Sequence, residues 1–185
     1  MKGIVFTTFN DMVENRIGIS CWESLLEKVK PASGGIYTSV EDFPDEELVA
    51  MLGHLSTITG KPVDELLIGF GQYLFAALAT KHPVFVTDQT DLFEFLKSID
   101  NVIHKEVEKL YQNPNLPQID CEQPSLDLLL LNYRSPRRLC HLADGLIRGA
   151  AKQFNTEVLI SHDLCMHDGS DHCAFRIIRV NERNN

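Results

Sequence analysis

The sequence predicts an α+β fold, in which helices fill the first part of the chain and a small antiparallel sheet with one crossing helix forms the last part. Two observations support this prediction. Apolar residues recur every three or four positions up to about Lys81, which is the spacing of an amphipathic helix. After about Gln118 they instead form short runs bounded by turn residues, as is typical of strands. Separate blocks of helices and strands characterise the α+β class.

Breaker residues divide the helical part into four predicted helices. In the third, Leu48, Met51, Leu52 and Leu55 mark one apolar face. The loop PASGG precedes that helix, and the tripeptide Gly-Lys-Pro ends it and opens the next one. The four predicted helices span Ile4–Asn15, Ser20–Lys30, Asp45–Thr59 and Val63–Thr80.

A further helical block and then strands are expected in the rest of the chain. The block spans Asp88–Tyr111 with a break near Asp100, and NPNLP at 113–117 ends it. We expect one domain over residues 1–185, with a helical part of about 1–82 and an α/β part of about 83–185. The later predicted elements are strands at Gln118–Asp120 and Ser125–Asn132, an amphipathic helix at Pro136–Phe154, and a β-hairpin at Thr156–Val180 that turns at Asp168-Gly169-Ser170.

Composition limits the class of partner and the compartment. A net charge of −9 and a pI near 5.2 disfavour nucleic acid or an anionic membrane as the main partner. The N-terminus has no signal-peptide pattern and no apolar stretch approaches the length of a membrane span, so we predict a cytoplasmic protein. The five cysteines form no regular framework, and in a reducing compartment they are expected to be free thiols or metal ligands.

Three strong hydrogen-bonding side chains alternate in the stretch LNYRSPRRLC, residues 131–140. In an extended chain Tyr133, Ser135 and Arg137 project to the same side, and together we call them the polar clamp. Pro136 favours an extended Ser135 and is well placed at the first position of a new helix. Two hydroxyls and a guanidinium suit an anion, in particular one with two carboxylates.

His104 is a candidate metal ligand in the second helical block. It borders an apolar stripe formed by Ile99, Ile103, Val107 and Leu110. From spacing alone both a hydrogen-bonded structural role and a ligand role stay open.

His104 and the polar clamp together resemble a known family. His104 lies about thirty residues before Tyr133, and the segments MKGIV, LPQI and DGSDHCAFRI add to the pattern over the whole chain. The sequence resembles the heme-nitric oxide/oxygen binding (H-NOX) family, which is related to the heme domain of soluble guanylate cyclase. The resemblance implies heme b between the two parts of the fold, with His104 as the iron ligand and the polar clamp on the propionates.

The resemblance also implies which residues line the heme and which gases it binds. Leu142 stands where family members that hold dioxygen stably have a tyrosine, so we expect nitric oxide and carbon monoxide to bind without stable oxygen binding.

The expected signalling partner is a histidine kinase or a cyclic-di-nucleotide enzyme, regulated when nitric oxide releases His104. Plain core packing remains open for each expected wall residue, namely Val5, Phe9, Phe75, Leu78, Pro117, Leu142 and Leu146.

A second cluster predicts a structural zinc site. Cys140, His162, Cys165 and Cys173 supply three thiolates and an imidazole, a plausible tetrahedral set. Their spacing is loose, ordinary buried cysteines remain open, and His141, His167 and His172 are nearby alternatives to His162. Some members of the resembled family carry a zinc with this Cys/His arrangement, which favours the site.

Three functions other than a sensor are possible alternatives: a redox switch, a peroxidase and a hydrolase. A redox switch could use the cysteines alone, with zinc loss exposing oxidisable thiols. A peroxidase would need polar groups on the distal side, whereas Leu142 and Leu146 have hydrocarbon side chains. A hydrolase would have to use Tyr133, Ser135 and His141, and these residues show no recognisable set of nucleophile, base and orienting group. We therefore expect a sensor domain and not an enzyme.

Overall fold

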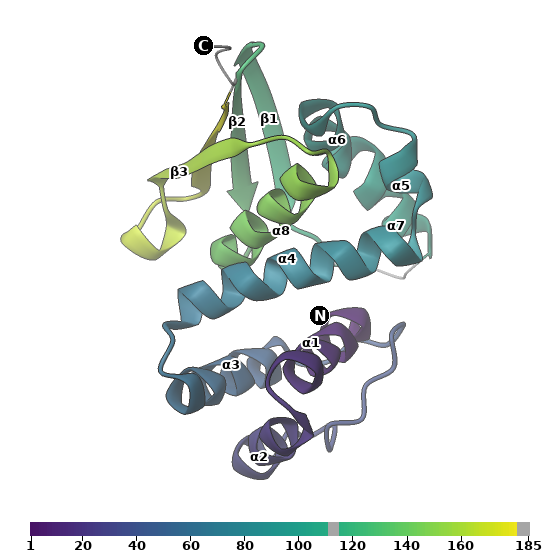
Figure 1. The fold of residues 1–185 in the computed structure, drawn as a ribbon, viewed down its shortest axis with the longest axis vertical. Coiled ribbons are helices and arrows are strands. Elements are labelled where there is room, and N and C mark those ends of the chain that lie inside the picture. The colour runs from purple at the N-terminus through teal and green to yellow at the C-terminus, as the bar shows by residue number, and fades with distance from the viewer. Residues whose placement is uncertain (111–114, 181–185) are drawn as a thin grey trace.

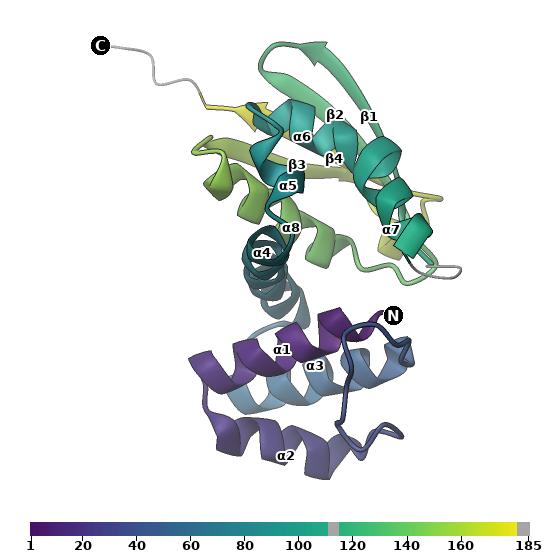
Figure 2. The same ribbon diagram turned by 90° about the vertical axis from the view of Figure 1, so that its right-hand side faces the viewer.

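The computed structural model describes residues 1–110 and 115–180 and shows two layers joined by a long helix. Helices α1 (Gly3–Arg16), α2 (Ile19–Val29) and α3 (Asp45–Thr59) form one layer, at the bottom of Figures 1 and 2. Helix α4 (Val63–Lys81) lies on this layer and also packs along α8 (Cys140–Gln153). The sheet and the remaining helices lie on the far side of α4 and α8, so the predicted α+β class is confirmed.

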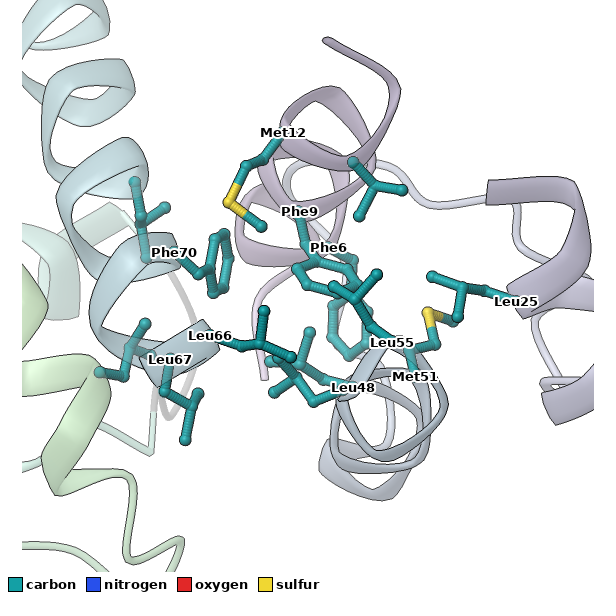
Figure 3. Close-up of a cluster of buried hydrophobic side chains, with 14 of the residues drawn as sticks. Phe6, Phe9, Met12, Leu25, Leu48, Met51, Leu55, Leu66, Leu67 and Phe70 are labelled. Atoms are coloured by element: carbon teal, nitrogen blue, oxygen red, sulfur yellow. The ribbon is translucent and has the colours of Figure 1, made fainter. Parts of the chain in front are cut away.

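Local signals define the ends of the N-terminal helices. Helix α3 has the predicted bounds: Asp45 and two glutamates occupy its positive first turn, and Gly60 ends it with a φ of 71°. Helices α1 and α2 differ from prediction by one residue at each end, and α4 by one residue at its C-terminal end. The apolar faces of all four helices form the first core, shown in Figure 3, where Phe9 and Phe70 meet at a centroid distance of 5.1 Å.

The second helical block is shorter and more broken than predicted. Its first residues are not helical, because the Asp91 carboxylate accepts the backbone N–H groups of Phe93 and Glu94 and so caps a helix that begins at Leu92. The predicted break at Asp100 is a π-helical turn. The elements are α5 (Val84–Thr87), α6 (Leu92–Ser98), the π-turn η1 (Ile99–His104) and α7 (Lys105–Leu110); Tyr111 and the first two residues of NPNLP lie outside the described residues.

The sheet has four antiparallel strands in the order β1-β2-β4-β3. The first strand was predicted too short and the second too early, since pairing along their whole length extends β1 to Ser125 and β2 to Arg134. Pro124 is tolerated in β1 because this strand lies at the sheet edge, next to a register shift. The C-terminal hairpin is confirmed. The strands are β1 (Gln118–Ser125), β2 (Leu128–Arg134), β3 (Val158–Leu164) and β4 (Cys173–Arg179), with the short 3-10 turn η2 (Met166–Asp168) between the last two.

Helix α8 begins at Cys140, so the prediction of a start at Pro136 was wrong. Pro136 and Arg137 form a turn in which the Arg138 N–H donates to the Ser135 carbonyl at 3.1 Å. Arg138 has a φ of 53°, a left-handed conformation that cannot start a right-handed helix. The polar clamp therefore spans the end of β2 and a turn.

Glycines allow α4 and α8 to approach at backbone distance. A Cβ atom on Gly71 would lie 2.7 Å from the Gly145 Cα and would overlap the Leu142 carbonyl oxygen. A Cβ atom on Gly149 would lie 2.6 Å from the Cβ atom of Phe75. The two helices consequently contact each other with almost no side chain between them.

The expectation that no apolar stretch reaches the length of a membrane span was wrong. Among the described residues, the 19-residue helix α4 is long and apolar enough by length and composition, with a mean hydropathy of 1.2. Phe70 and Leu74 on α4 are buried in the first core and Phe75 in the second, so α4 contributes side chains to both cores.

Candidate functional site

The two hydroxyls of the polar clamp lie together in a buried position. Tyr133, at the end of β2, is 4% exposed, and Ser135 is 5% exposed. Their side chains share a hydrogen bond, and burial raises the pKa of the Tyr133 phenol. Two buried hydroxyls next to each other form a polar spot in an otherwise apolar core.

Arg137 completes the polar clamp but is paired with a carboxylate that the sequence did not indicate. Its Nε donates to Asp45 Oδ2 at 2.5 Å, and its guanidinium also donates to the Asn115 carbonyl. Asp45 Oδ1 lies 2.8 Å from the amine of Met1. Burial alone would raise the pKa of Asp45, but bonds from the amine and Arg137 outweigh it and lower that pKa. Asp45 is 92 residues from Arg137, so no local spacing could have revealed this ion pair.

His104 stands at the end of the π-turn and is oriented by a carboxylate. Its Nδ1 lies 3.1 Å from Asp100 Oδ1, which also accepts the backbone N–H of Ile119 at 3.4 Å. No described residue bonds to Nε2. A carboxylate on one ring nitrogen fixes the tautomer and leaves the other nitrogen available, as in many metal-binding histidines. The pair was not predicted, although the i, i+4 spacing of Asp100 and His104 is visible in the sequence.

The expected heme-wall residues lie in or against the two apolar cores, except for Pro117. Phe9 and Leu142 belong to the first core and Phe75 to the second. Leu146 packs against both cores. Val5 and Leu78 are half-buried against the first core, and Pro117 is half-buried outside both cores. These positions agree with plain packing as well as with a ligand wall.

Three cysteines from separate elements form a thiol cluster of Cys140, Cys165 and Cys173. The Cys165 Sγ lies 3.8 Å from Cys140 Sγ and 3.9 Å from Cys173 Sγ, and all three thiols are free. In a tetrahedral zinc site with bonds of about 2.3 Å, neighbouring sulfurs are about 3.8 Å apart. Burial raises the pKa of the Cys140 and Cys173 thiols, so they are protonated at neutral pH without a metal. The thiol cluster therefore has the dimensions that zinc requires.

His162, the predicted fourth zinc ligand, lies farther from the thiol cluster than the three sulfurs lie from one another. The three sulfurs lie within 4.8 Å of one another, and no nitrogen of His162 lies within that distance of all of them. Its Nε2 is nevertheless buried without a hydrogen-bond partner, and burial lowers the pKa of the ring. An unpaired buried nitrogen on the same hairpin as Cys165 and Cys173 is consistent with a fourth ligand whose ring would have to move to reach the metal. His162 is next to the register shift in β3, where the backbone departs from regular pairing.

Comparison with known proteins settles the family. The model of the haem-NO-binding (HNOB) family matches residues 2–162. The chain belongs to the haem-NO-binding family. Solved H-NOX structures agree with this assignment: the S. oneidensis protein in its Fe(II)NO state is 40% identical, covers 98% of this chain and all of its own, and superposes with a TM-score of 0.92. The Shewanella oneidensis H-NOX domain in its Fe(II)CO state is also 40% identical, with the same coverage and a TM-score of 0.90.

More distant H-NOX relatives are parts of guanylate cyclases. The soluble guanylate cyclase gcy-31 of Caenorhabditis elegans is 28% identical over 173 residues, or 89% of this chain. The chain spans 24% of the length of that relative. As an H-NOX domain, this protein is a heme-binding domain of the gas-sensor type and is not a catalytic domain.

The residues present fit the heme that H-NOX domains bind. The group requires one axial nitrogen, apolar walls and donors for two carboxylates. His104 offers a free Nε2, the two cores offer the walls, and the polar clamp offers the donors. Arg137 Nε is bonded to Asp45 and one terminal nitrogen to the Asn115 carbonyl, so a propionate would bind the remaining terminal nitrogen or displace one of these partners.

Proposed function

We propose that this H-NOX domain is a heme-based nitric oxide sensor in which residues 1–185 act as one unit. Bound heme b supplies a ferrous iron that takes up nitric oxide or carbon monoxide. His104 holds the iron through Nε2, and Tyr133, Ser135 and Arg137 hold the two propionates. The observation that carries the proposal is the Asp100 carboxylate 3.1 Å from His104 Nδ1, because it orients the ring and leaves Nε2 for a metal.

The His104→Gly variant tests this assignment. It should hold heme only when imidazole is supplied, since the ring is then the one missing component. Heme retention and absorbance spectra with and without imidazole measure the outcome. An unchanged spectrum without imidazole would remove His104 from the site.

The wall residues follow from the same proposal. Val5 and Phe9 from α1, Phe75 and Leu78 from α4, and Leu142 and Leu146 from α8 would contact the apolar faces of the heme, and Pro117 would lie on the proximal side. Leu146 supports the placement because it packs against both cores. These side chains would stabilise bound heme, which is a large apolar disc, by about 25 cal/mol per Å² of apolar surface that becomes buried.

Release of His104 would be the switch. Nitric oxide bound to the iron would loosen the hold of His104 on it. His104 lies at the end of a π-turn, a geometry that is less stable than α-helix. Detachment would let η1 and α7 change conformation and so alter a surface that a separate protein contacts. We expect that protein to be a histidine kinase or a cyclic-di-nucleotide enzyme in the cytoplasm, where free cysteines are stable.

Gas selectivity would follow from Leu142. This side chain is 8% exposed and supplies no hydrogen-bond donor. Stable dioxygen binding benefits from a donor to the bound, polarised ligand, whereas nitric oxide and carbon monoxide do not depend on it. The proposed pocket therefore prefers nitric oxide and carbon monoxide.

A structural zinc would occupy the thiol cluster, with His162 as the fourth ligand. The sulfur distances of 3.8 and 3.9 Å and the unpaired His162 Nε2 support it. Zinc would tie the start of α8 to the C-terminal hairpin. A redox sensor is a second candidate, since thiols this close can form a disulfide if the metal is lost.

The alternative enzymes gain no support from the geometry. Leu142 and Leu146 leave the distal side apolar, unlike a peroxidase. His141 lies against Asp64 and Cys140. Among the described residues, no hydrogen bond joins it to the hydroxyls of Tyr133 and Ser135, which a hydrolase would need.

A further inference from the structure

A cavity of about 570 Å³ lies next to the thiol cluster. Of the three thiols, Cys140 and Cys173 are fully buried, whereas Cys165 is half-buried and forms part of the cavity wall. The cavity is therefore the side from which an ion in solvent can reach the buried thiols.

Three imidazole rings follow one another along this cavity. His167 on the η2 turn is exposed, the side chain of His141 in the first turn of α8 is 23% exposed, and Nε2 of His162 is buried. The ring centroids of His167 and His141 are 6.1 Å apart, and those of His141 and His162 are 5.7 Å apart. Imidazole is a common ligand of zinc, so the rings offer an ion successive nitrogens from the surface inward.

Cys140 connects these rings to the thiol cluster. Its Sγ lies within 4.8 Å of the sulfurs of Cys165 and Cys173. It also lies within 4.8 Å of ring nitrogens of His141 and His167, which are within the same distance of each other. With Zn–S bonds of about 2.3 Å and Zn–N bonds of about 2.0 Å, a sulfur and a nitrogen on one tetrahedral ion are about 3.5 Å apart. Cys140 Sγ lies 3.9 Å from His141 Nδ1, so small side-chain movements bring both onto one ion.

Carboxylates in the cavity wall favour the approach of a cation. Asp64 and Asp168 both line the wall, and the side chain of Asp64 is 66% exposed. Asp64 Oδ1 lies 3.3 Å from His141 Nδ1, so this nitrogen stands between an exposed carboxylate and the thiol of Cys140. Negative charges around a concave site raise the local concentration of cations. The wall therefore supplies both attraction and ligands.

We infer that Cys140, His141 and His167 form an entry set, through which zinc reaches and leaves the thiol cluster. The inference rests on the zinc site proposed above and adds no second resting place for the ion. Cys140 stays bound throughout, while the two imidazoles are exchanged for the thiolates of Cys165 and Cys173. Zinc can pass through a five-coordinate state, so an incoming ligand binds before an outgoing one leaves. The protons displaced from the thiols go to solvent.

An entry set changes rates without changing the equilibrium. Because the two imidazoles do not hold the ion in its final place, their loss raises the barriers to uptake and release equally. The affinity for zinc, which is set by the ratio of the two rates, then stays constant. A permanent ligand such as the proposed His162 behaves differently, since its loss lowers the affinity itself.

Zinc release from the heme-loaded, zinc-loaded protein tests this inference. The protein is mixed with excess EDTA, the chelator is removed at set times, and the zinc left per chain is counted by elemental analysis. The double variant with His141→Ala and His167→Ala should release zinc about tenfold more slowly than the parent, a size typical of losing a partner of a metal. Equilibrium competition with a limiting amount of EDTA gives the affinity, which should equal that of the parent.

Three further variants make the result specific. His167→Ala changes an exposed side chain, so it should fold as the parent does and slow release by a smaller factor. His162→Ala should lower the affinity, as expected for a ligand. His172→Ala is the matched control and should change neither quantity, since His172 pairs with Asp171 on the same hairpin and does not line the cavity.

The zinc site and the entry set can fail separately. A parent protein that holds no zinc would overturn both. A parent that holds zinc, with release unchanged in the double variant and in His167→Ala, would overturn the entry set alone. An affinity that falls in the double variant as far as in His162→Ala would make the histidines permanent ligands, and that result also contradicts an entry set.

Discussion

Arg137 and Asp45 form an ion pair of 2.5 Å that joins the turn after β2 to the first turn of α3. The pair spans the two layers of the fold, and the amine of Met1 binds the same carboxylate at 2.8 Å. Arg137 is also the proposed propionate ligand. In that role, one side chain would couple heme binding to the attachment of the α1–α3 layer.

The Asp45→Asn variant should reduce stability in a pH-dependent way. We expect the free energy of unfolding at neutral pH to fall by about 1–2 kcal/mol, the contribution of a partly exposed charge-assisted pair. The folded-state pKa of Asp45 is lower than its ordinary 3.8, so the stabilisation is complete above 3.8 and is lost as pH falls through the lower value.

Urea unfolding at several pH values measures this effect. The difference between parent and Asp45→Asn should shrink below about pH 4. Asp42→Asn is the control, because Asp42 pairs with Lys2 at an exposed position and should contribute little. A difference that stays constant through the acid range would show that the Asp45 charge is not the cause.

Arg137→Ala should accelerate heme loss. A propionate would lose its charge-assisted partner, which contributes roughly 1.5–3 kcal/mol, so we expect dissociation about tenfold faster or more. Arg134→Ala is the control, since Arg134 is half-exposed on the other face of β2. Transfer of heme to an acceptor protein gives the rate. Equal rates for the parent and Arg137→Ala would place Arg137 outside the heme site.

Asp100→Asn tests the orientation of His104 more gently than removal of the ring. The amide keeps the size of the carboxylate but weakens the bond to Nδ1. Heme affinity should fall by about tenfold, the usual cost of losing an outer-shell carboxylate. Replacing Asp120 on β1, which is exposed, gives a control. No change in affinity would mean that Asp100 serves only the backbone of Ile119.

The thiol cluster should hold close to one zinc per chain in freshly reduced protein. Cys165→Ser should lower the zinc content and the melting temperature together, since binding and folding are linked. His162→Ala should do the same if His162 is the fourth ligand. Cys121→Ser is the control because Cys121 lies on β1, away from the cluster. Elemental analysis that finds no zinc in the parent would rule out the site.

Leu142 should exclude stable dioxygen binding. In air the ferrous protein should keep its unliganded spectrum, while nitric oxide should give a five-coordinate spectrum as His104 detaches. Leu142→Tyr adds a donor worth about 1–3 kcal/mol with good geometry, so oxygen affinity should rise. Leu142→Phe adds the ring without the hydroxyl and should show no gain. Equal gains in both variants would assign the effect to pocket shape.

Local signals predicted most of the fold, and non-local contacts account for the errors. Asp45–Thr59 was predicted with correct bounds because proline, acidic residues and Gly60 mark its ends. The ends of β1 and β2 depend on their mutual pairing, which no single segment encodes. Helix α8 begins later than predicted because Arg138 has a left-handed backbone conformation, and nothing in the sequence around Pro136 indicates that conformation.

For the candidate sites too, local signals were predictable from the sequence and non-local contacts were not. Residue types and spacing, together with the family resemblance, selected the polar clamp and the cysteines, and Cys140, Cys165 and Cys173 do meet in space. Asp45 was not predicted, because only folding brings it to Arg137. His167 likewise comes close to His141 and Cys140 only through tertiary packing.

The close contact between Gly71 and Gly145 holds α4 and α8 rigidly against each other where they cross. At this crossing backbone lies against backbone, and no side chain lies between the two glycines whose rotamer could absorb a displacement. The proposed heme walls on these two helices, Phe75 and Leu142 among them, would therefore keep a nearly fixed spacing. A change in the shape of the pocket would then come from the parts on either side of this helix pair, namely the α1–α3 layer and the segment of η1 and α7.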